Sequence, residues 1–306
     1  MNGKRGYREN NMEQKRLTRS QHNRMICGVC AGIGEYFGID ATIVRLIGIG
    51  LICFGGLGIF AYIFAAIIIP EDYTEWEAGI EHIVSLENMA IPNLDLKLDA
   101  GYFEIIESNV SDIVVKSNKE INVNKDGNTI KIHTPLKIIT TKMDTRATIE
   151  IPQGMKFQDV FMNVGAGELR CQSIAADNLK IKVGAGKIIA ENFDSAKSVI
   201  SVGAGEITVN AGVSADMDID VGMGSFTFHG TANGDLVANC GVGNVQLWLD
   251  GDQRDYNYHV KCAMGNITVG DNSYGGMATD QHMDNNAAYQ CKLDCGMGRI
   301  AVHFEN

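Results

Sequence analysis

The sequence predicts two parts of different fold class: a helical membrane segment at the N-terminus and an all-β, solenoid-like stack over most of the remaining chain. Two observations predict this division. A run of 24 nearly unbroken apolar residues covers 46–69 of the 306-residue chain. A short glycine motif then recurs five times at intervals of 19 residues, and a fixed short period indicates one structural unit stacked on copies of itself.

The apolar run 46–69 is predicted to be a single transmembrane helix, because a helix needs about 20 apolar residues to cross a bilayer. A cleaved signal peptide would lie at the N-terminus, whereas 45 residues precede this run. The sequence before the run is basic, and residues 71–81 contain five acidic residues and no base. The positive-inside rule therefore predicts a cytoplasmic N-terminus and an extracytoplasmic C-terminal part.

The distribution of charge supports this division. Residues 1–45 hold eight Lys/Arg and four Asp/Glu and so carry +4, while the whole chain carries −11, which leaves −15 for the rest. A basic head and an acidic body predict different surroundings for the two parts. The basic arm is short and lacks interleaved aromatic residues, so we expect no nucleic-acid partner.

The segment before the apolar run is predicted to form a helix at the membrane surface. Val29, Ile33 and Phe37 recur at a spacing of four, which aligns them on one helical face. Gly28 and Gly32 form a small-xxx-small pair of the kind that lets helices approach closely in lipid, although simple glycine richness would give the same pattern. The basic residues are suited to hold anionic lipid or a cytoplasmic partner. The candidate membrane or partner contacts are Arg16, Arg19, Arg24, Gly28, Gly32 and Arg45.

The order of residues around the apolar run resembles the phage shock protein C (PspC) domain. The matching features are the basic start at 15–17, the core Gly28-Val29-Cys30-Ala31-Gly32, the stretch 35–38 and the closing Pro70-Glu71. The resemblance implies a component of the cytoplasmic membrane that senses membrane damage in an envelope-stress response. It also implies partners among other envelope-stress proteins, PspA-like or within the membrane. Homo-oligomer formation is left open.

The glycine motifs are predicted to be corners between β-strands. Apolar residues alternate with polar or small ones on both sides of each motif, which is the period of a strand. Such units stack in parallel, like residue over like, so we predict a β-solenoid or a close relative. Two further motifs follow at looser spacing, around Ala263 and Gly296, so seven rungs about 4.8 Å apart would form a stack roughly 29 Å tall. Glycine suits a corner where a side chain would collide or where φ must be positive. The repeat glycines at the 19-residue spacing are Gly165, Gly167, Gly184, Gly186, Gly203, Gly205, Gly222, Gly224, Gly241 and Gly243.

Two stretches do not fit the 19-residue period. Extra residues near 251–254 and within 270–286 are predicted to loop out of the stack. The region 83–160 is predicted to be the irregular start of the same stack, with Gly101 aligned to the second glycine of later motifs and Asp126-Gly127-Asn128 as a hairpin turn. The predicted domains are a basic cytoplasmic arm over 1–14, a PspC-like domain over 15–72, an acidic linker over 73–90 and a β-repeat domain over 91–306.

The β-repeat region resembles the putative-adhesin family of unknown function, the LiaF/LiaG-like toastrack β-domain. This resemblance rests on the repeated GxG–strand pattern. A PspC domain joined to such a domain fits envelope-stress sensing or regulation. The alternative is a membrane-anchored surface adhesin or cell-wall binding protein, for which the PspC-like segment would serve as an anchor.

No pattern in the sequence indicates catalysis. The glycine motifs contain neither GxGxxG nor GxxxxGK[ST], and they lack the aspartate that calcium-binding repeats carry in every unit. The histidines at 229, 259, 282 and 303 are scattered, without HExxH. Asp280, His282 and Asp284 lie together in a polar insertion, where such a grouping is expected by chance. We therefore predict no enzyme, no cofactor and no metal site.

Five of the eight cysteines lie in the repeat region, and an odd number argues against a complete disulfide framework. Three of them, Cys240, Cys262 and Cys295, share one inward column, where stacked neighbours would be close enough for a disulfide. Cysteine is also a good small core residue, and we favour reduced thiols. Cys27 and Cys30 form a CxxC pair with only His22 nearby, so we expect neither a zinc site nor a redox pair there.

Overall fold

The computed structural model describes residues 33, 39–40, 42–44, 79–135, 145–275 and 278–305. The chain divides into two compact units, 1–75 and 76–306. The predicted transmembrane helix and all six candidate contact residues lie outside the described residues. Of the three residues that define the predicted membrane-surface helix, only Ile33 is described. Within the described part of the chain, no helix is long and apolar enough to cross a membrane.

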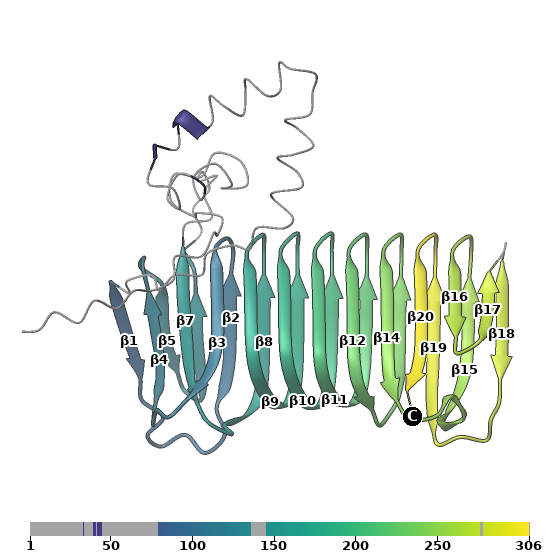
Figure 1. Cartoon of the computed structure of the whole chain (residues 1–306). Helices are drawn as coiled ribbons and strands as arrows, with labels where there is room; N and C mark the ends of the chain where they lie inside the picture. Colours follow the sequence, from purple (N-terminus) through teal and green to yellow (C-terminus); the bar gives the residue numbers. More distant parts are fainter. Residues whose placement is uncertain are drawn as a thin grey trace, which may run out of the picture. The chain divides into compact units, whose positions relative to one another are not determined.

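The second unit is an all-β stack, as predicted, and 20 strands among its described residues form one continuous hydrogen-bonded sheet (Figure 1). Its regular centre consists of β9 (Glu168–Val183), β10 (Lys187–Val202) and β11 (Glu206–Val221). These strands pair in parallel, and each residue of β10 lies beside the residue 19 positions earlier in β9 and 19 positions later in β11. One 19-residue repeat therefore forms one rung of the stack.

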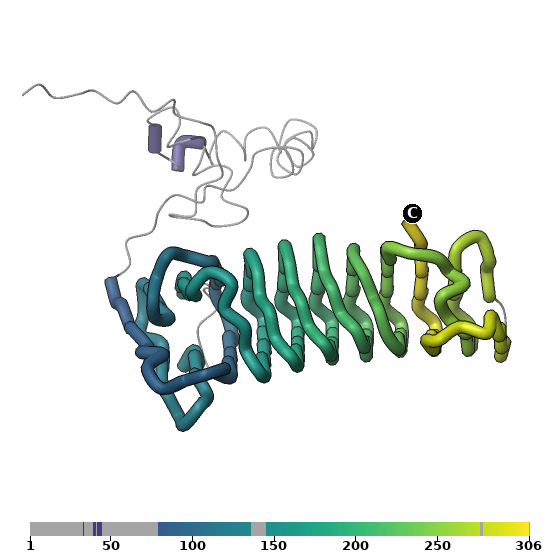
Figure 2. Tube along the Cα trace, turned by 90° about the horizontal axis from the view of Figure 1, so that it is seen from below, coloured from purple at the N-terminus to yellow at the C-terminus, as the bar shows by residue number. Residues whose placement is uncertain are grey.

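The glycine corners divide the sheet into two facing layers, which the tube in Figure 2 shows as successive coils. Strands that follow a corner form one layer and strands that precede a corner form the other, and β9, β10 and β11 pass from the first layer into the second. Besides these three, the post-glycine layer contains β1 (Ile80–Val84), β4 (Ile113–Ser117), β7 (Arg146–Pro152), β3 (Tyr102–Ser108), β12 (Ser225–Ala232), β14 (Asn244–Asp250), β20 (Arg299–Glu305), β16 (Asn266–Val269) and β17 (Asn272–Gly275).

The other layer is built in the same way from strands that come before the corners. It contains β5 (Asn122–Asp126), β6 (Thr129–His133), β2 (Asn93–Leu98), β8 (Lys156–Val164), β13 (Leu236–Cys240), β19 (Tyr289–Cys295), β15 (Tyr256–Cys262) and β18 (Thr279–Met283). Pairing is parallel inside the stack and antiparallel at its ends, where β1, β5, β17 and β18 are the outermost strands. Such end strands stop the ladder from continuing into another chain.

The last rung of the sequence is not the last rung in space. Strand β19 pairs on one side with β13 and on the other with β15, and β20 likewise lies between β14 and β16. In Figure 1 the yellow pair β19–β20 accordingly stands between β14 and β15–β16. The chain therefore leaves one rung position open after β14, builds the rungs beyond it, and returns to fill the gap.

The repeat pattern alone does not predict this order. The short 3-10 helix at Gln253–Asp255 occupies the first predicted excursion. The second, 270–286, forms β17 and β18 as well as loops. The sequence could not reveal the order, because all rungs carry the same apolar columns, and each rung can therefore pack equally well against any other.

The irregular start also forms as predicted, with one difference. The hairpin β5–β6 turns at Gly127 and Asn128, and Gly127 has the positive φ of 56° that such a turn favours. At the first corner, the Gly101 carbonyl accepts a hydrogen bond from the Glu168 amide, so Gly101 aligns with Gly167. The difference is β1, which lies within the stretch 73–90 that we expected to be a linker.

Inward side chains from both layers fill the space between them. The residues two positions after the second glycine, from Leu169 to Ile267, are completely buried in every rung of the repeat. The Phe193 ring on β10 reaches the Phe228 ring on β12, two rungs away, with ring centroids 5.7 Å apart, and Phe226 lies 6.4 Å from Phe228 on the same strand. A cluster of three serines interrupts this core. Ser195, Ser198 and Ser214 are buried and bond to one another, with Oγ–Oγ distances of 2.6 to 3.3 Å.

The two glycines of each motif have different roles. A Cβ on the second glycine would overlap the carbonyl oxygen of the preceding rung, as at Gly224, where it would meet the oxygen of Gly205. A Cβ on the first glycine meets the preceding rung at 2.8 to 3.2 Å. None of the ten repeat glycines has a positive φ. Close approach, and not backbone conformation, is therefore the reason for glycine here, and the sixth rung indeed has Ala263 at the first position and Gly265 at the second.

We predict that Gly224→Ala destabilises the β-unit by about 1–3 kcal/mol, the usual cost of overpacking. The matched change Gly222→Ala, in the same corner, has 3.2 Å to the nearest atom and should cost less than about 1 kcal/mol. Urea unfolding followed by circular dichroism measures both. Equal losses from the two substitutions would contradict the distinct roles of the glycines.

Candidate functional site

A shallow groove of about 580 Å³ follows the glycine corners over five rungs. Its floor is formed by the small middle residues of the motifs, Ala166, Ala185 and Ala204, together with the second glycines. Tyr102 lines it at the first rung and Met223 at the fifth. The groove exists because the corners carry no larger side chain over this part of the stack.

Alternating charges line the groove. Glu168, Lys187 and Glu206 follow the second glycine on successive rungs, and the Lys187 ammonium lies 3.2 Å from the Glu206 carboxylate. At the first rung, the Arg146 guanidinium lies 5.4 Å from the centre of the Tyr102 ring. Glu168 is paired with the Arg170 guanidinium at 2.9 Å, and the charged side chains along the groove suit contacts with a polar partner surface.

From the fifth rung of the groove onward, the same corner position is apolar and prominent. In spatial order the middle residues are Met223, Val242, Met297 and Met264, and their exposed fractions are 72%, 54%, 58% and 64%. The corner edge of the stack therefore changes from a groove to an apolar ridge.

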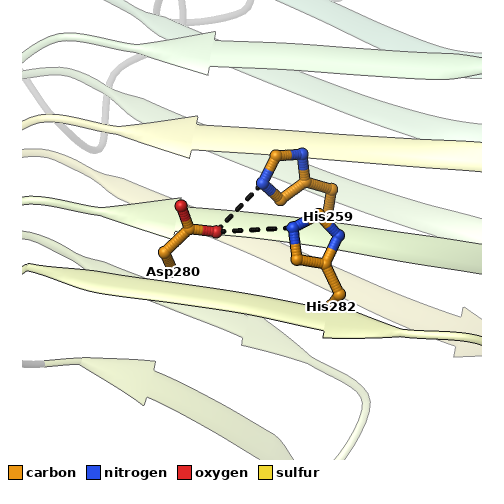
Figure 3. Close-up of side chains that lie close together, drawn as sticks. All are labelled: His259, Asp280 and His282. Atoms are coloured by element: carbon orange, nitrogen blue, oxygen red, sulfur yellow. Dashed lines mark hydrogen bonds and ion pairs between the residues drawn. The ribbon is translucent and has the colours of Figure 1, made fainter.

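Three polar side chains converge at the far end of the stack, on β15 and its edge neighbour β18 (Figure 3). The Nε2 atoms of His259 and His282 lie 3.0 and 3.7 Å from Oδ1 of Asp280. The two imidazole rings stack with centroids 3.8 Å apart. Sequence reasoning placed Asp280 and His282 in a loop and left out His259, because the strand that brings them together could not be foreseen.

The histidines that looked scattered in the sequence are grouped in the structure. Besides the pair on β15 and β18, His229 and His303 stack on the two sides of Trp248, with ring centroids 5.6 and 4.0 Å from the indole. These three residues occupy one outward column on β12, β14 and β20. The 19-residue period pairs His229 with Trp248 in the sequence, but His303 joins them only because the last rung is inserted beside β14.

The five cysteines of the β-unit are free and buried. Cys295 lies between Cys240 and Cys262, because its rung is the inserted one. Burial raises the pKa of the Cys171 thiol and of the Cys295 thiol to about 12. The neutral thiol is therefore the stable form inside the stack, and the thiolate, which is the reactive form, is disfavoured.

Comparison with known protein families accounts for both parts of the chain. The PspC domain family matches residues 15–72. The family described as Toastrack DUF4097 matches residues 67–302, which is more than half of the chain. The chain belongs to the toastrack family. The two matches confirm both resemblances seen in the sequence. PspC domains are typical of membrane-associated proteins, and neither family is one of enzymes.

Solved structures resemble the toastrack unit at low sequence identity. A protein described as a "putative adhesin" from Parabacteroides distasonis is 13% identical, with a TM-score of 0.43, over 72% of this chain and 95% of its own. A "putative lipid binding protein" from the same organism is 14% identical, with a TM-score of 0.39, over 74% and 96%. A "putative cell adhesion protein" from Clostridium sporogenes is 12% identical, with a TM-score of 0.33, over 74% and 98%. No curated protein matches the chain.

We predict that the buried thiols resist alkylation in the folded toastrack unit. In a variant with Cys27, Cys30 and Cys53 replaced by serine, iodoacetamide at pH 8 should label no thiol in the folded protein and five after denaturation. The raised pKa values also predict a loss of stability at high pH, because unfolded thiols ionise from about pH 9 while the folded ones do not until about pH 12. Rapid labelling of the folded protein at pH 8 would contradict this prediction.

Proposed function

We propose that the protein is a membrane-anchored sensor or regulator of envelope stress that acts through protein and membrane contacts. The observation that supports this most directly is the union of a PspC domain and a toastrack unit in one chain. In this proposal residues 46–69 cross the cytoplasmic membrane once. The basic arm stays in the cytoplasm at anionic lipid, and the β-stack lies outside.

The short connection between the two parts supports a role close to the membrane. Ten residues, 70–79, separate the end of the predicted helix from the start of β1. Even fully extended they reach at most about 35 Å. The β-stack would therefore work within reach of the membrane surface and of other proteins embedded in it.

The surface of the stack supports contact and not catalysis as its role. The groove over the corners is shallow and spans several rungs, with small residues on its floor and alternating charges along it. Such a surface is suited to an elongated partner, and we propose that protein partners in the stress response contact the stack there. The proposed contacts on the membrane side remain Arg16, Arg19, Arg24, Gly28, Gly32 and Arg45.

The topology is testable with one engineered thiol. Ala196 is exposed, and it lies where the pairing of β10 with both neighbours is interrupted. We predict that Ala196→Cys is labelled by a membrane-impermeant maleimide in intact cells, beyond the background of the unchanged protein. The matched variant Asn11→Cys, in the basic arm, should be labelled only after the cells are permeabilised. Protection of Ala196→Cys in intact cells would refute the extracytoplasmic placement.

The regulatory role is testable by deletion and complementation. We predict that deleting the gene alters the induction of stress genes by a membrane-active agent, and that the full chain restores it. Ala185→Arg, which fills the groove floor, should restore it poorly. Ala211→Arg, an exposed alanine on β11 outside the groove, should restore it fully. Unaltered induction in the deletion strain, with a loss of surface attachment, would support the adhesin alternative instead.

A further inference from the structure

The far end of the stack is closed by a strand pair whose outward side chains converge. Strand β18 pairs antiparallel with β15, and His282 stands directly opposite His259. Asp280 lies two residues before His282 and therefore on the same face. Opposed residues of an antiparallel pair have Cβ atoms about 4.5–5.5 Å apart, which places two imidazoles and a carboxylate within reach of one point.

The donor atoms are spaced as metal ligands are. One ring nitrogen of His259, one ring nitrogen of His282 and a carboxylate oxygen of Asp280 all lie within 4.8 Å of one another. The two nitrogen–oxygen distances are 3.0 and 3.7 Å. Zinc bonds of about 2.0–2.2 Å in a tetrahedron place neighbouring ligand atoms about 3.3–3.5 Å apart. Small rotations of the exposed Asp280 and His282 side chains would meet that spacing.

The two carboxylate oxygens of Asp280 have different neighbours. The Lys261 ammonium lies 3.9 Å from Oδ2 of Asp280, whereas both imidazoles face Oδ1. On the other side of β15, Lys292 stands opposite His259 and Asp294 stands opposite Lys261. The positive charges of Lys261 and Lys292 disfavour binding of a cation, and the negative charges of Asp280 and Asp294 favour it.

We propose that His259, Asp280 and His282 form a binding site for a divalent transition-metal ion of the zinc type. Imidazole nitrogen and carboxylate oxygen are the ligands that zinc accepts, and imidazole also suits copper and nickel. Three protein ligands leave a fourth position for water or an external ligand on an exposed surface.

The proposed ion would join two strands that differ in their support. β15 is held on its other side by β19, whereas among the described strands β18 pairs with β15 alone. A metal bridge between them fastens the end strand to the stack. It thereby stabilises the excursion that the chain makes before it returns to its last rung.

The test is a titration of the untagged full-length protein in detergent with Zn²⁺ alone, read against a chromophoric chelator. To exclude any contribution from the thiols of Cys27 and Cys30, the titration uses the background Cys27→Ser/Cys30→Ser. We expect one Zn²⁺ per chain. His282→Ala and Asp280→Asn should each weaken binding by at least about tenfold. Gln281→Ala, on the opposite face of the same strand, should leave the affinity unchanged.

A second measurement guards against a change that merely disturbs β18. Co²⁺ bound in place of Zn²⁺ should give visible absorption bands that His259→Ala abolishes, while circular dichroism shows an intact stack. Hydrogen exchange of the β18 amides should slow on addition of Zn²⁺. The proposal is overturned if no saturable binding of one ion occurs in this background, or if binding survives both His282→Ala and Asp280→Asn.

Discussion

The stack depends on how closely one corner approaches the next. From Gly186 onward, the second glycine of each motif faces the carbonyl oxygen of the preceding rung with no room for a Cβ. That approach lets the corner amides donate to the rung before, as Lys187 does to Gly167 at 2.8 Å. The hydrogen-bond ladder therefore continues around the bend from one layer to the other. Without it, polar backbone groups would be left unpaired at every corner, at a cost comparable to a lost hydrogen bond each.

Once the corners are fixed, each rung must present the same columns to its neighbours. Apart from the buried serines, inward positions are apolar, so burial adds up along the stack, and each rung is stabilised mainly by the two beside it. The outward positions are free to vary, which is why the surface changes along its length. Alanines give a groove at one part of the corner edge, and methionines give a ridge at another. Function can differ from rung to rung while the core stays constant.

Much of this architecture is readable from the sequence. The period, the strand alternation, the corner glycines and the hairpin at Gly127 all arise from local rules, and the structure agrees with them. The order of the rungs does not arise from local rules, because β19 fits beside β13 as well as β15 would. The cluster of His259, Asp280 and His282 depends on that order and on β18, so the sequence could not reveal it. The buried serines around Ser198 were equally hidden, since an alternating pattern does not say which small polar residues face inward.

The inserted rung has a consequence for how the chain reaches its final form. β19 and β20 are synthesised after all the other strands, yet they occupy the middle of the stack's far half. Until they arrive, β13 and β14 have a free edge, and β15 and β16 have no parallel partner. The contacts that close this gap join residues about 55 positions apart, such as Cys240 and Cys295, whereas the central rungs join residues 19 apart. Folding should therefore be fast through the regular centre and slower at closure, because long-range pairing must first overcome the entropy of its loop.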